Sequence, residues 1–175
     1  NLSKIKRLEF GRLPFTMLPQ SFGRLSGLTF LNLDHNPLTE LPASFGDLTA
    51  LDSLILSYTQ IRRLPESIGG LVNLSYLECK YTNLDSLSEA IGNLDNLKYL
   101  HLGNNQLTAL PDAFGNFLSL VNLYLAYNHI AVLPAAMSNL SATLKMLDLR
   151  GNPISPEELA RIKANLQALY EAGPG

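Results

Sequence analysis

The chain has 175 residues, of which 46% are hydrophobic and 16% charged, so it has the composition of a folded protein. Its 13 basic residues nearly balance its 15 acidic ones. This balance argues against a dedicated binder of nucleic acid or of anionic membranes, because such proteins usually carry a basic excess. The single cysteine, Cys79, excludes an intrachain disulfide and favours a reducing compartment.

No apolar run approaches the roughly 18 residues of a membrane span, and no signal peptide is visible. The sequence begins at Asn1 and not at a methionine. We therefore expect a processed protein or an excised piece of a larger one.

A set of apolar positions recurs along almost the whole chain with a period of 23 residues, and once of 24. The units begin at Ile5, Leu28, Leu51, Leu74, Leu97, Leu120 and Leu144. The first unit is irregular and the last is truncated at Ile154, which makes seven units in total. A fixed period of this length indicates a stack of equivalent structural units.

The recurring pattern is LxxLxLxxNxLxxLPxxFGxL, and it covers residues 5–154. It resembles the leucine-rich repeat proteins. The 23-residue form with LPxxFG or LPxxIG is similar to the intracellular class found in plant Ras-group-related repeat proteins, Scribble-type scaffolds, Roco proteins and bacterial effectors. The resemblance implies an α/β fold, a curved right-handed solenoid. About seven short parallel strands line its concave face, and its convex side is irregular or 3-10 helical.

The pattern has a physical reason to stack. The last two leucines of LxxLxL are two residues apart, so they share one face of a short strand. A strand of that length cannot bury its apolar face alone, whereas the strand of the next unit beside it extends one continuous core.

The turn after each strand needs buried polar groups to pair its backbone. An amide is available at Asn36, Asn105, Asn128 and Asn152. Thr59 and Thr82 replace it in two consecutive units, where we expect a weaker ladder because a hydroxyl has fewer hydrogen-bonding options. The proline after each LxxL predicts an extended backbone, and the glycine after Phe or Ile predicts a close or left-handed turn. Cys79 replaces a strand leucine and should be a buried, inert thiol.

The C-terminal segment breaks the repeat, so we divide the chain into repeats at 1–154 and a capping helix with a tail at 155–175. Ser155 and Glu158 predict a capping box, with Pro156 at the first helical position. An apolar stripe should close the open end of the core; its members are Leu159, Ile162, Leu166 and Leu169. A helix that binds a partner is the alternative. At the N-terminus no such cap is visible, and we expect further repeats or a cap upstream.

Residues suited to chemistry are scattered. His35, His101 and His129 fall in different units without carboxylates or cysteines at metal-ligand spacing, which indicates solvated surface histidines. No phosphate-binding or dinucleotide-binding glycine motif occurs. We expect no catalytic residue, no metal site and no cofactor, and hence no enzymatic activity of this chain itself.

Six of the seven tyrosines fall at positions that the repeat directs outward on the strand side. We predict that they form an aromatic patch centred on the third to sixth units. The predicted partner-binding residues are Phe30, Tyr58, Tyr76, Tyr81, Tyr99, His101, Tyr124 and Tyr127. Tyrosine offers a large contact area with a polar tip, as binding hot spots require. The alternative is that tyrosine merely stabilises neighbouring strands.

The sequence thus predicts a monomeric protein-interaction module that recognises a protein or peptide, and neither nucleic acid nor membrane. The expected location is the cytoplasm, or a host cell if the protein is a translocated bacterial effector. Two alternatives remain open. The chain is the substrate-recognition part of a larger enzyme, such as an effector ubiquitin ligase or a Roco GTPase, or it is an extracellular ligand sensor.

Overall fold

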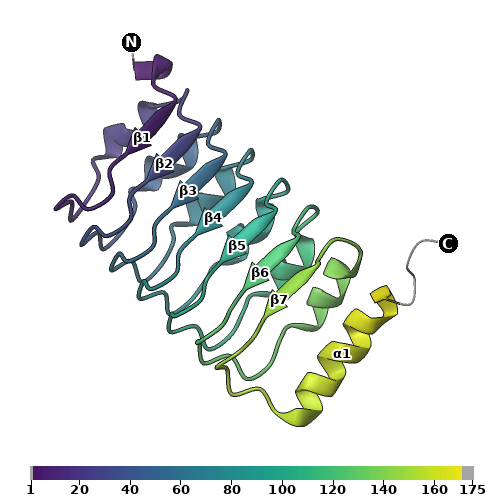
Figure 1. Ribbon diagram of the computed structural model, residues 1–175. Helices are drawn as coiled ribbons and strands as arrows, with labels where there is room; N and C mark the ends of the chain where they lie inside the picture. Colours follow the sequence, from purple (N-terminus) through teal and green to yellow (C-terminus); the bar gives the residue numbers. More distant parts are fainter. Residues whose placement is uncertain (1, 171–175) are drawn as a thin grey trace.

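The computed structural model describes residues 2–170, with side chains described for residues 2–165. Seven short strands form one parallel sheet in chain order, and each lies beside the strand of the preceding unit (Figure 1). The strands are β1 (Arg7–Glu9), β2 (Phe30–Asn32), β3 (Ser53–Ile55), β4 (Tyr76–Glu78), β5 (Tyr99–His101), β6 (Asn122–Tyr124) and β7 (Met146–Asp148). The predicted solenoid, with its seven strands, is confirmed.

Equivalent residues of successive units are paired across the sheet. Leu54 of β3 lies opposite Leu77 of β4, which lies opposite Leu100 of β5. The single 24-residue step does not disturb this register, since Leu123 still pairs with Leu147. The additional residue falls outside the sheet, in a 3-10 helix of 8 residues where the preceding units have 5.

The opposite side of the stack consists of 3-10 helices, which lie behind the strands in Figure 1. They are η1 (Leu2–Lys4), η2 (Gln20–Arg24), η3 (Ala43–Asp47), η4 (Glu66–Gly70), η5 (Glu89–Asn93), η6 (Asp112–Asn116) and η7 (Ala135–Ala142). Pro42 precedes η3 with the expected extended backbone, at φ −65° and ψ 153°. Ser88 stands in the proline position before η5, where its hydroxyl oxygen accepts a hydrogen bond from the Ala90 N–H at 3.2 Å.

The recurring glycines permit close approach between successive 3-10 helices. A Cβ atom at Gly46 would lie 2.1 Å from the Ser67 carbonyl oxygen, and one at Gly115 would lie 2.4 Å from that of Ala136. Both distances are far below any tolerable contact, so only glycine fits. Neither glycine has a positive φ. Of the two predicted roles, close approach is therefore the one that applies.

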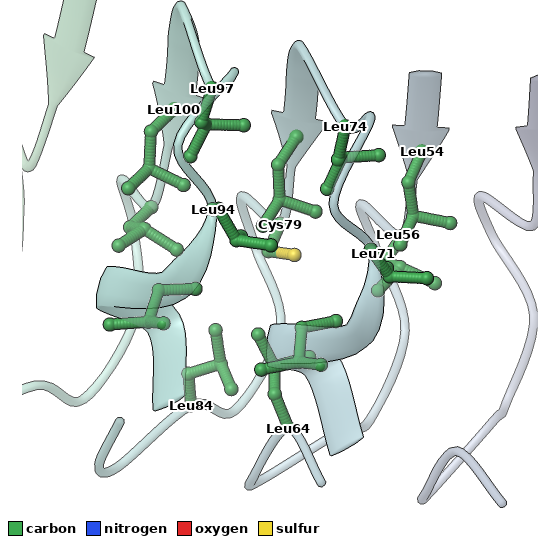
Figure 2. Packing of buried hydrophobic residues seen from close by; sticks show 14 of the residues in the cluster. Leu54, Leu56, Leu64, Leu71, Leu74, Cys79, Leu84, Leu94, Leu97 and Leu100 are labelled. Carbon is green, nitrogen blue, oxygen red and sulfur yellow. The ribbon is translucent and has the colours of Figure 1, made fainter. Parts of the chain in front are cut away.

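One continuous hydrophobic core lies between the sheet and the 3-10 helices. The central leucines of the strands, such as Leu54, Leu77 and Leu100, are 0% exposed. Figure 2 shows Cys79 among core leucines such as Leu56, Leu74 and Leu94, with its sulfur inside the core. Burial, with a smaller contribution from the neighbouring Glu78 charge, raises the pKa of the Cys79 thiol. The thiol is therefore protonated and shielded, as expected for an inert cysteine.

Buried amides connect successive units below the sheet. Asn105 Nδ2 donates to the carbonyl oxygens of Cys79 at 2.7 Å and Leu102 at 3.0 Å, which belong to two different units. Its Oδ1 accepts from the Thr82 hydroxyl at 2.6 Å. The neighbouring amide thus compensates for the threonine at position 82. Thr59, in contrast, donates to the Leu56 carbonyl of its own unit at 2.9 Å.

The C-terminal helix α1 (Pro156–Tyr170) begins at the predicted residue, but only half of the predicted capping box forms. The Glu158 N–H donates to Ser155 Oγ at 3.1 Å. The Glu158 carboxylate does not return this bond; it accepts from the Leu133 N–H at 2.9 Å and from Arg161. Anchoring the helix to the sixth unit has displaced the reciprocal capping bond.

The predicted apolar stripe of α1 is also only partly correct. Ile162 is 6% exposed and joins the core. Leu159 is 41% exposed, because the helix packs through Ile162 and leaves Leu159 at the rim of a recess beside β7. The side chains of Leu166 and Leu169 lie outside the described residues.

Candidate functional site

The strand side of the stack presents three regular columns of side chains. In each of β2 to β6 the central residue is buried and its two neighbours are half-buried, so the first and third strand residues form two outward columns. A further column lies just beyond the strand ends and contains Arg12, His35, Tyr58, Tyr81, Asn104, Tyr127 and Gly151. We call this third set the turn column.

Four aromatic residues of β4, β5 and β6 form one group, the strand-face cluster: Tyr76, Tyr99, His101 and Tyr124. The rings of Tyr76 and Tyr99 are stacked, with centroids 4.4 Å apart and planes 6° from parallel. The ring centroid of Tyr124 lies 5.3 Å from that of Tyr99 and 5.0 Å from that of His101. Sheet register produces these contacts, because Tyr76 pairs with Tyr99 and His101 pairs with Tyr124.

Glu78 lies at the edge of the strand-face cluster with both carboxylate oxygens occupied. Tyr76 Oη donates to Oε2 at 2.7 Å, and Ser57 Oγ donates to Oε1 at 2.8 Å. Lys80 Nζ lies 3.3 Å from Oε1. Burial alone would raise the pKa of Glu78, but these hydrogen bonds and the lysine charge outweigh burial and lower that pKa. The same burial and the bond to Glu78 raise the pKa of the Tyr76 phenol.

His101 is half-buried and hydrogen-bonded, so the prediction of a merely solvated histidine is wrong for this residue. Its Nδ1 accepts a hydrogen bond from the Gly103 N–H at 3.1 Å, which leaves Nε2 to carry the proton of the neutral ring. Burial, assisted by the Lys80 charge, lowers the pKa of His101. The neutral ring therefore presents a hydrogen-bond donor beside Tyr124.

The turn column has an unusual backbone. Its members from Arg12 to Tyr127 have φ between 51° and 62°, and Gly151 has φ 71°. The left-handed region is unfavourable for residues with a Cβ atom and costs on the order of 1 kcal/mol or more for a bulky side chain. Sequence reasoning missed this feature, although Asn104 and Gly151, which tolerate such a backbone, occupy the column and could have signalled it.

Three rings of the turn column stack on one another. His35 and Tyr58 have ring centroids 4.3 Å apart, and Tyr58 and Tyr81 have centroids 4.8 Å apart with planes within 7°. We call His35, Tyr58 and Tyr81 the turn ladder. These tyrosines are far more exposed than those of the strands: Tyr58 is 43% and Tyr81 47% exposed.

Two of the predicted residues lie apart from both groups. Phe30 contacts Arg7, whose guanidinium carbon lies 3.5 Å from the ring centroid, and Ser53 of β3 separates Phe30 from Tyr76. Tyr127 occupies the turn column, but Asn104 separates it from Tyr81. The aromatic residues therefore form two groups and two separate side chains, where the sequence predicted one nearly continuous patch.

Within residues 2–170, no group of three or more histidine, cysteine, aspartate or glutamate side chains is placed to hold a metal ion. Over the same residues no helix has both the length and the hydropathy needed to cross a bilayer.

In the comparison with known protein families, both families that match the chain are families of leucine-rich repeats. A family described as "Leucine-rich repeat region" matches residues 50–126 and 66–171, and one described as "Leucine Rich Repeat" matches residues 27–48. No curated protein sequence matched the chain.

Solved structures similar to the chain include plant receptors. The structure of a TDR receptor is 31% identical with a TM-score of 0.78, covering 89% of this chain and 28% of that one. The ectodomain of the Arabidopsis thaliana membrane receptor kinase GASSHO1/SCHENGEN3, solved with CASPARIAN STRIP INTEGRITY FACTOR 2, is 30% identical with a TM-score of 0.77, covering 89% and 20%. A leucine-rich repeat protein of Leptospira interrogans is 27% identical with a TM-score of 0.59. The chain spans 53% of that protein and less of the others.

Proposed function

Because the chain belongs to the leucine-rich repeat family, we propose that it is a protein-recognition module that binds a polypeptide through its strand-face cluster and turn ladder. The observation that carries the proposal is the confinement of six of seven tyrosines to outward columns, where all but Tyr127 join one of two groups of neighbouring rings. Tyrosines that served only to strengthen strands would have no reason to occupy the left-handed turn column.

The backbone conformation supports a binding role for the turn ladder. Asn or Gly would fit the left-handed region at lower cost, and the column uses both elsewhere. Tyr58 and Tyr81 stand there in spite of this cost and remain nearly half exposed. Strained, exposed residues gather at functional sites, and Tyr is enriched among the residues that dominate binding energy.

The charges on this side of the stack favour a polypeptide over a polyanion. Three cations on this side are paired with anions, Arg7 with Glu9, Lys80 with Glu78 and Arg150 with Asp148, whereas Arg12 forms no ion pair within residues 2–170. A groove that follows a phosphate backbone would present unpaired basic residues. Two similar structures contain named partners: GASSHO1/SCHENGEN3 with CASPARIAN STRIP INTEGRITY FACTOR 2, and the peptide hormone receptor RGFR1 with RGF2.

The chain spans only part of the similar structures, so the same surface would also suit the recognition part of a longer protein. We assign no reaction to the chain itself.

The proposal is tested by selecting peptides from a displayed random library against the immobilised chain and measuring their affinity by calorimetry. Tyr81→Ala, Tyr99→Ala and Tyr124→Ala should each weaken binding by about 1–3 kcal/mol. The rings lie on the strand face and not in the core, so each of these substitutions should lower the free energy of unfolding by only about 1 kcal/mol or less.

Asp47→Ala is the matched control, because Asp47 is an exposed residue at the end of η3, on the opposite side of the stack. It should change neither affinity nor stability. If selected peptides bound the three tyrosine variants as tightly as the parent, the proposed surface would be abandoned.

A further inference from the structure

We propose that the outer edge of β7 binds an extended, acidic segment of a partner polypeptide, which joins the sheet as a further parallel strand. The edge lies at the C-terminal end of the stack, where α1 follows β7 (Figure 1). The inference goes beyond the proposed function, since this site does not include the turn ladder. Of the strand-face cluster, only Tyr124 also borders the site.

The backbone of the seventh unit carries two hydrogen-bond donors without acceptors. In the sixth unit, the N–H groups of Leu125 and Tyr127 donate to carbonyl groups of the seventh unit at 2.8 and 2.7 Å. The equivalent donors one unit further along are the N–H groups of Leu149 and Gly151, and neither has an acceptor within residues 2–170. An extended segment whose carbonyl groups lie two residues apart would accept from both, as the strand of a next unit would.

The side chains beside these donors line an apolar recess of about 760 Å³ between β7 and α1. Leu147, Leu149 and Ile154 are half-buried there, whereas the equivalent residues of the sixth unit are 0% exposed. The volume lies within the range of about 300–1,000 Å³ that ligand sites usually have. Because strand side chains alternate between two faces, the occupant should carry apolar residues at two alternate positions.

The charges around the recess favour an acidic occupant. Arg150 and Lys163 line it together with one carboxylate, that of Asp148. Asp148 is paired with Arg150, and Lys163 forms no ion pair among the side chains of residues 2–165. If the occupant continues the register of the sheet, its outward residue after the second apolar one lies beside Arg150. A carboxylate at that position would form an opposite-charge pair across the two strands.

A second copy of the chain fits this edge less well than an acidic segment does. Two copies related by a two-fold axis would bring the same surface together. The shared interface would then contain Arg150 and Lys163 from both copies, with only Asp148 from each copy to balance them. Like charges brought together at an interface oppose association, so we assign the edge to a different polypeptide.

The test uses the peptide acetyl-Ser-Leu-Thr-Leu-Glu-Glu-amide as the probe and backbone amide NMR of the whole chain as the readout. We expect saturable shifts at the amides of Leu149 and Gly151, together with slower hydrogen exchange at both. A permuted peptide with the order Ser-Thr-Leu-Leu-Glu-Glu cannot place both leucines on one face of a strand. It should therefore bind about tenfold more weakly.

Leu159→Glu places a carboxylate in the recess and should weaken binding of the acidic probe about tenfold or more. Leu159 is already 41% exposed, so this variant should fold as the parent does. Ala160→Glu is the matched control, because it introduces the same side chain at the next position of α1, which is exposed and does not line the recess. It should bind the probe as the parent does.

An exchange of charge gives a second route that leaves the apolar contacts unchanged. Lys163→Glu should weaken binding of the acidic probe about threefold and strengthen binding of acetyl-Ser-Leu-Thr-Leu-Lys-Lys-amide by a similar factor. The proposal is overturned if the acidic probe causes no saturable shift at Leu149 and Gly151, or if the permuted peptide binds as tightly. It is also overturned if Lys163→Glu leaves the preference between the two charged peptides unchanged.

Sedimentation velocity of the parent and of Leu159→Glu tests whether a second copy takes the edge instead. A monomeric parent leaves the edge free for a partner segment, as the proposal requires. A dimer that Leu159→Glu dissociates and Ala160→Glu does not would overturn the proposal, because the occupant would then be another copy of this chain.

Discussion

The middle of the stack and its two ends are built from the same repeat, yet they are buried to different extents. Leu54, Leu77 and Leu100 are completely buried, whereas Leu8 of β1 and Leu147 of β7 are only half-buried. The side chains and their register are equivalent, so the difference comes from the number of neighbouring units. Burial in this fold is therefore a property of the stack and not of the individual repeat.

The two ends are also closed in different ways. At the C-terminal end, Glu158 accepts a hydrogen bond from the Leu133 N–H, and Arg161 donates one to the Leu133 carbonyl at 2.7 Å. These two bonds attach α1 to the backbone of the sixth unit. A recess of about 760 Å³ nevertheless remains between β7 and α1. At the N-terminal end β1 pairs normally with β2, while Leu2 is 55% exposed.

The largest expected effect concerns the core leucines. Leu125 is 0% exposed in the sixth unit, so Leu125→Ala should lower the free energy of unfolding by about 2–5 kcal/mol. The same truncation at Leu8, which already contacts water, should cost less than half as much. Urea titration of both variants measures the contrast. Equal losses would mean that neighbouring units do not determine burial.

A smaller effect is expected from the buried amides. Asn105 is 2% exposed, so Asn105→Ala leaves carbonyl groups of Cys79 and Leu102 without their donor and should cost about 2–3 kcal/mol. Asn152 makes equivalent bonds to Leu125 and Leu149 but is half-buried near the C-terminal end. Water can replace its amide, so Asn152→Ala should cost about 1 kcal/mol. Thermal unfolding of the two variants distinguishes these cases.

The smallest expected effect is the loss of folding stability at acidic pH. The pKa of Glu78 is lowered in the folded chain, so its contribution is present above the free glutamate pKa of about 4.3 and is lost as pH falls through the folded value. Between about pH 5 and 3, Glu78→Gln should reduce this loss by about half a kcal/mol, a figure discounted because water screens the group. Asp148→Asn, in the same column at the C-terminal end, should reduce it less. Its partner Arg150 is largely exposed.

The lowered pKa of His101 also makes the folded chain less stable on acidification, but in a higher pH range than Glu78 does. The unfolded chain binds the proton more readily, so stability should also fall as pH drops below about 6.5. Urea midpoints measured across this range would separate the two steps. A midpoint that rose on acidification would contradict both assignments.

Most of the fold could be predicted because it follows from side-chain type at fixed spacing. The leucines determine the register, the prolines give the extended backbone before the 3-10 helices, and the recurring glycines permit these helices to approach closely. Predictions failed where a residue had two possible partners. The Glu158 carboxylate was expected to complete the capping box with Ser155 and instead accepts from the Leu133 N–H and from Arg161. Leu159 was assigned to the core, although among the described side chains of α1 only Ile162 is deeply buried. Periodicity identifies the face of a helix but not how far that face is covered.

The candidate site was predictable in composition but not in geometry. The outward columns follow from strand alternation, so the tyrosines could be assigned to one side of the molecule. Their division into two groups could not, because it depends on which rings contact one another; Ser53 and Asn104, which interrupt the columns, separate only Phe30 and Tyr127 from these groups. The left-handed backbone of Tyr58 and Tyr81 was also unforeseen, since bulky residues rarely adopt it.

The glycine contacts between the 3-10 helices influence the arrangement of the rings on the opposite, strand side of the molecule. Strand spacing is fixed by hydrogen bonds, whereas the spacing of the 3-10 helices depends on the absence of one carbon atom at positions such as Gly46. A methyl group there would force η3 and η4 apart and tilt the second unit against the third. The tilt would change the angle between the rings of His35 and Tyr58, which belong to those units. The alignment of the exposed rings is thus adjustable from the opposite surface of the molecule.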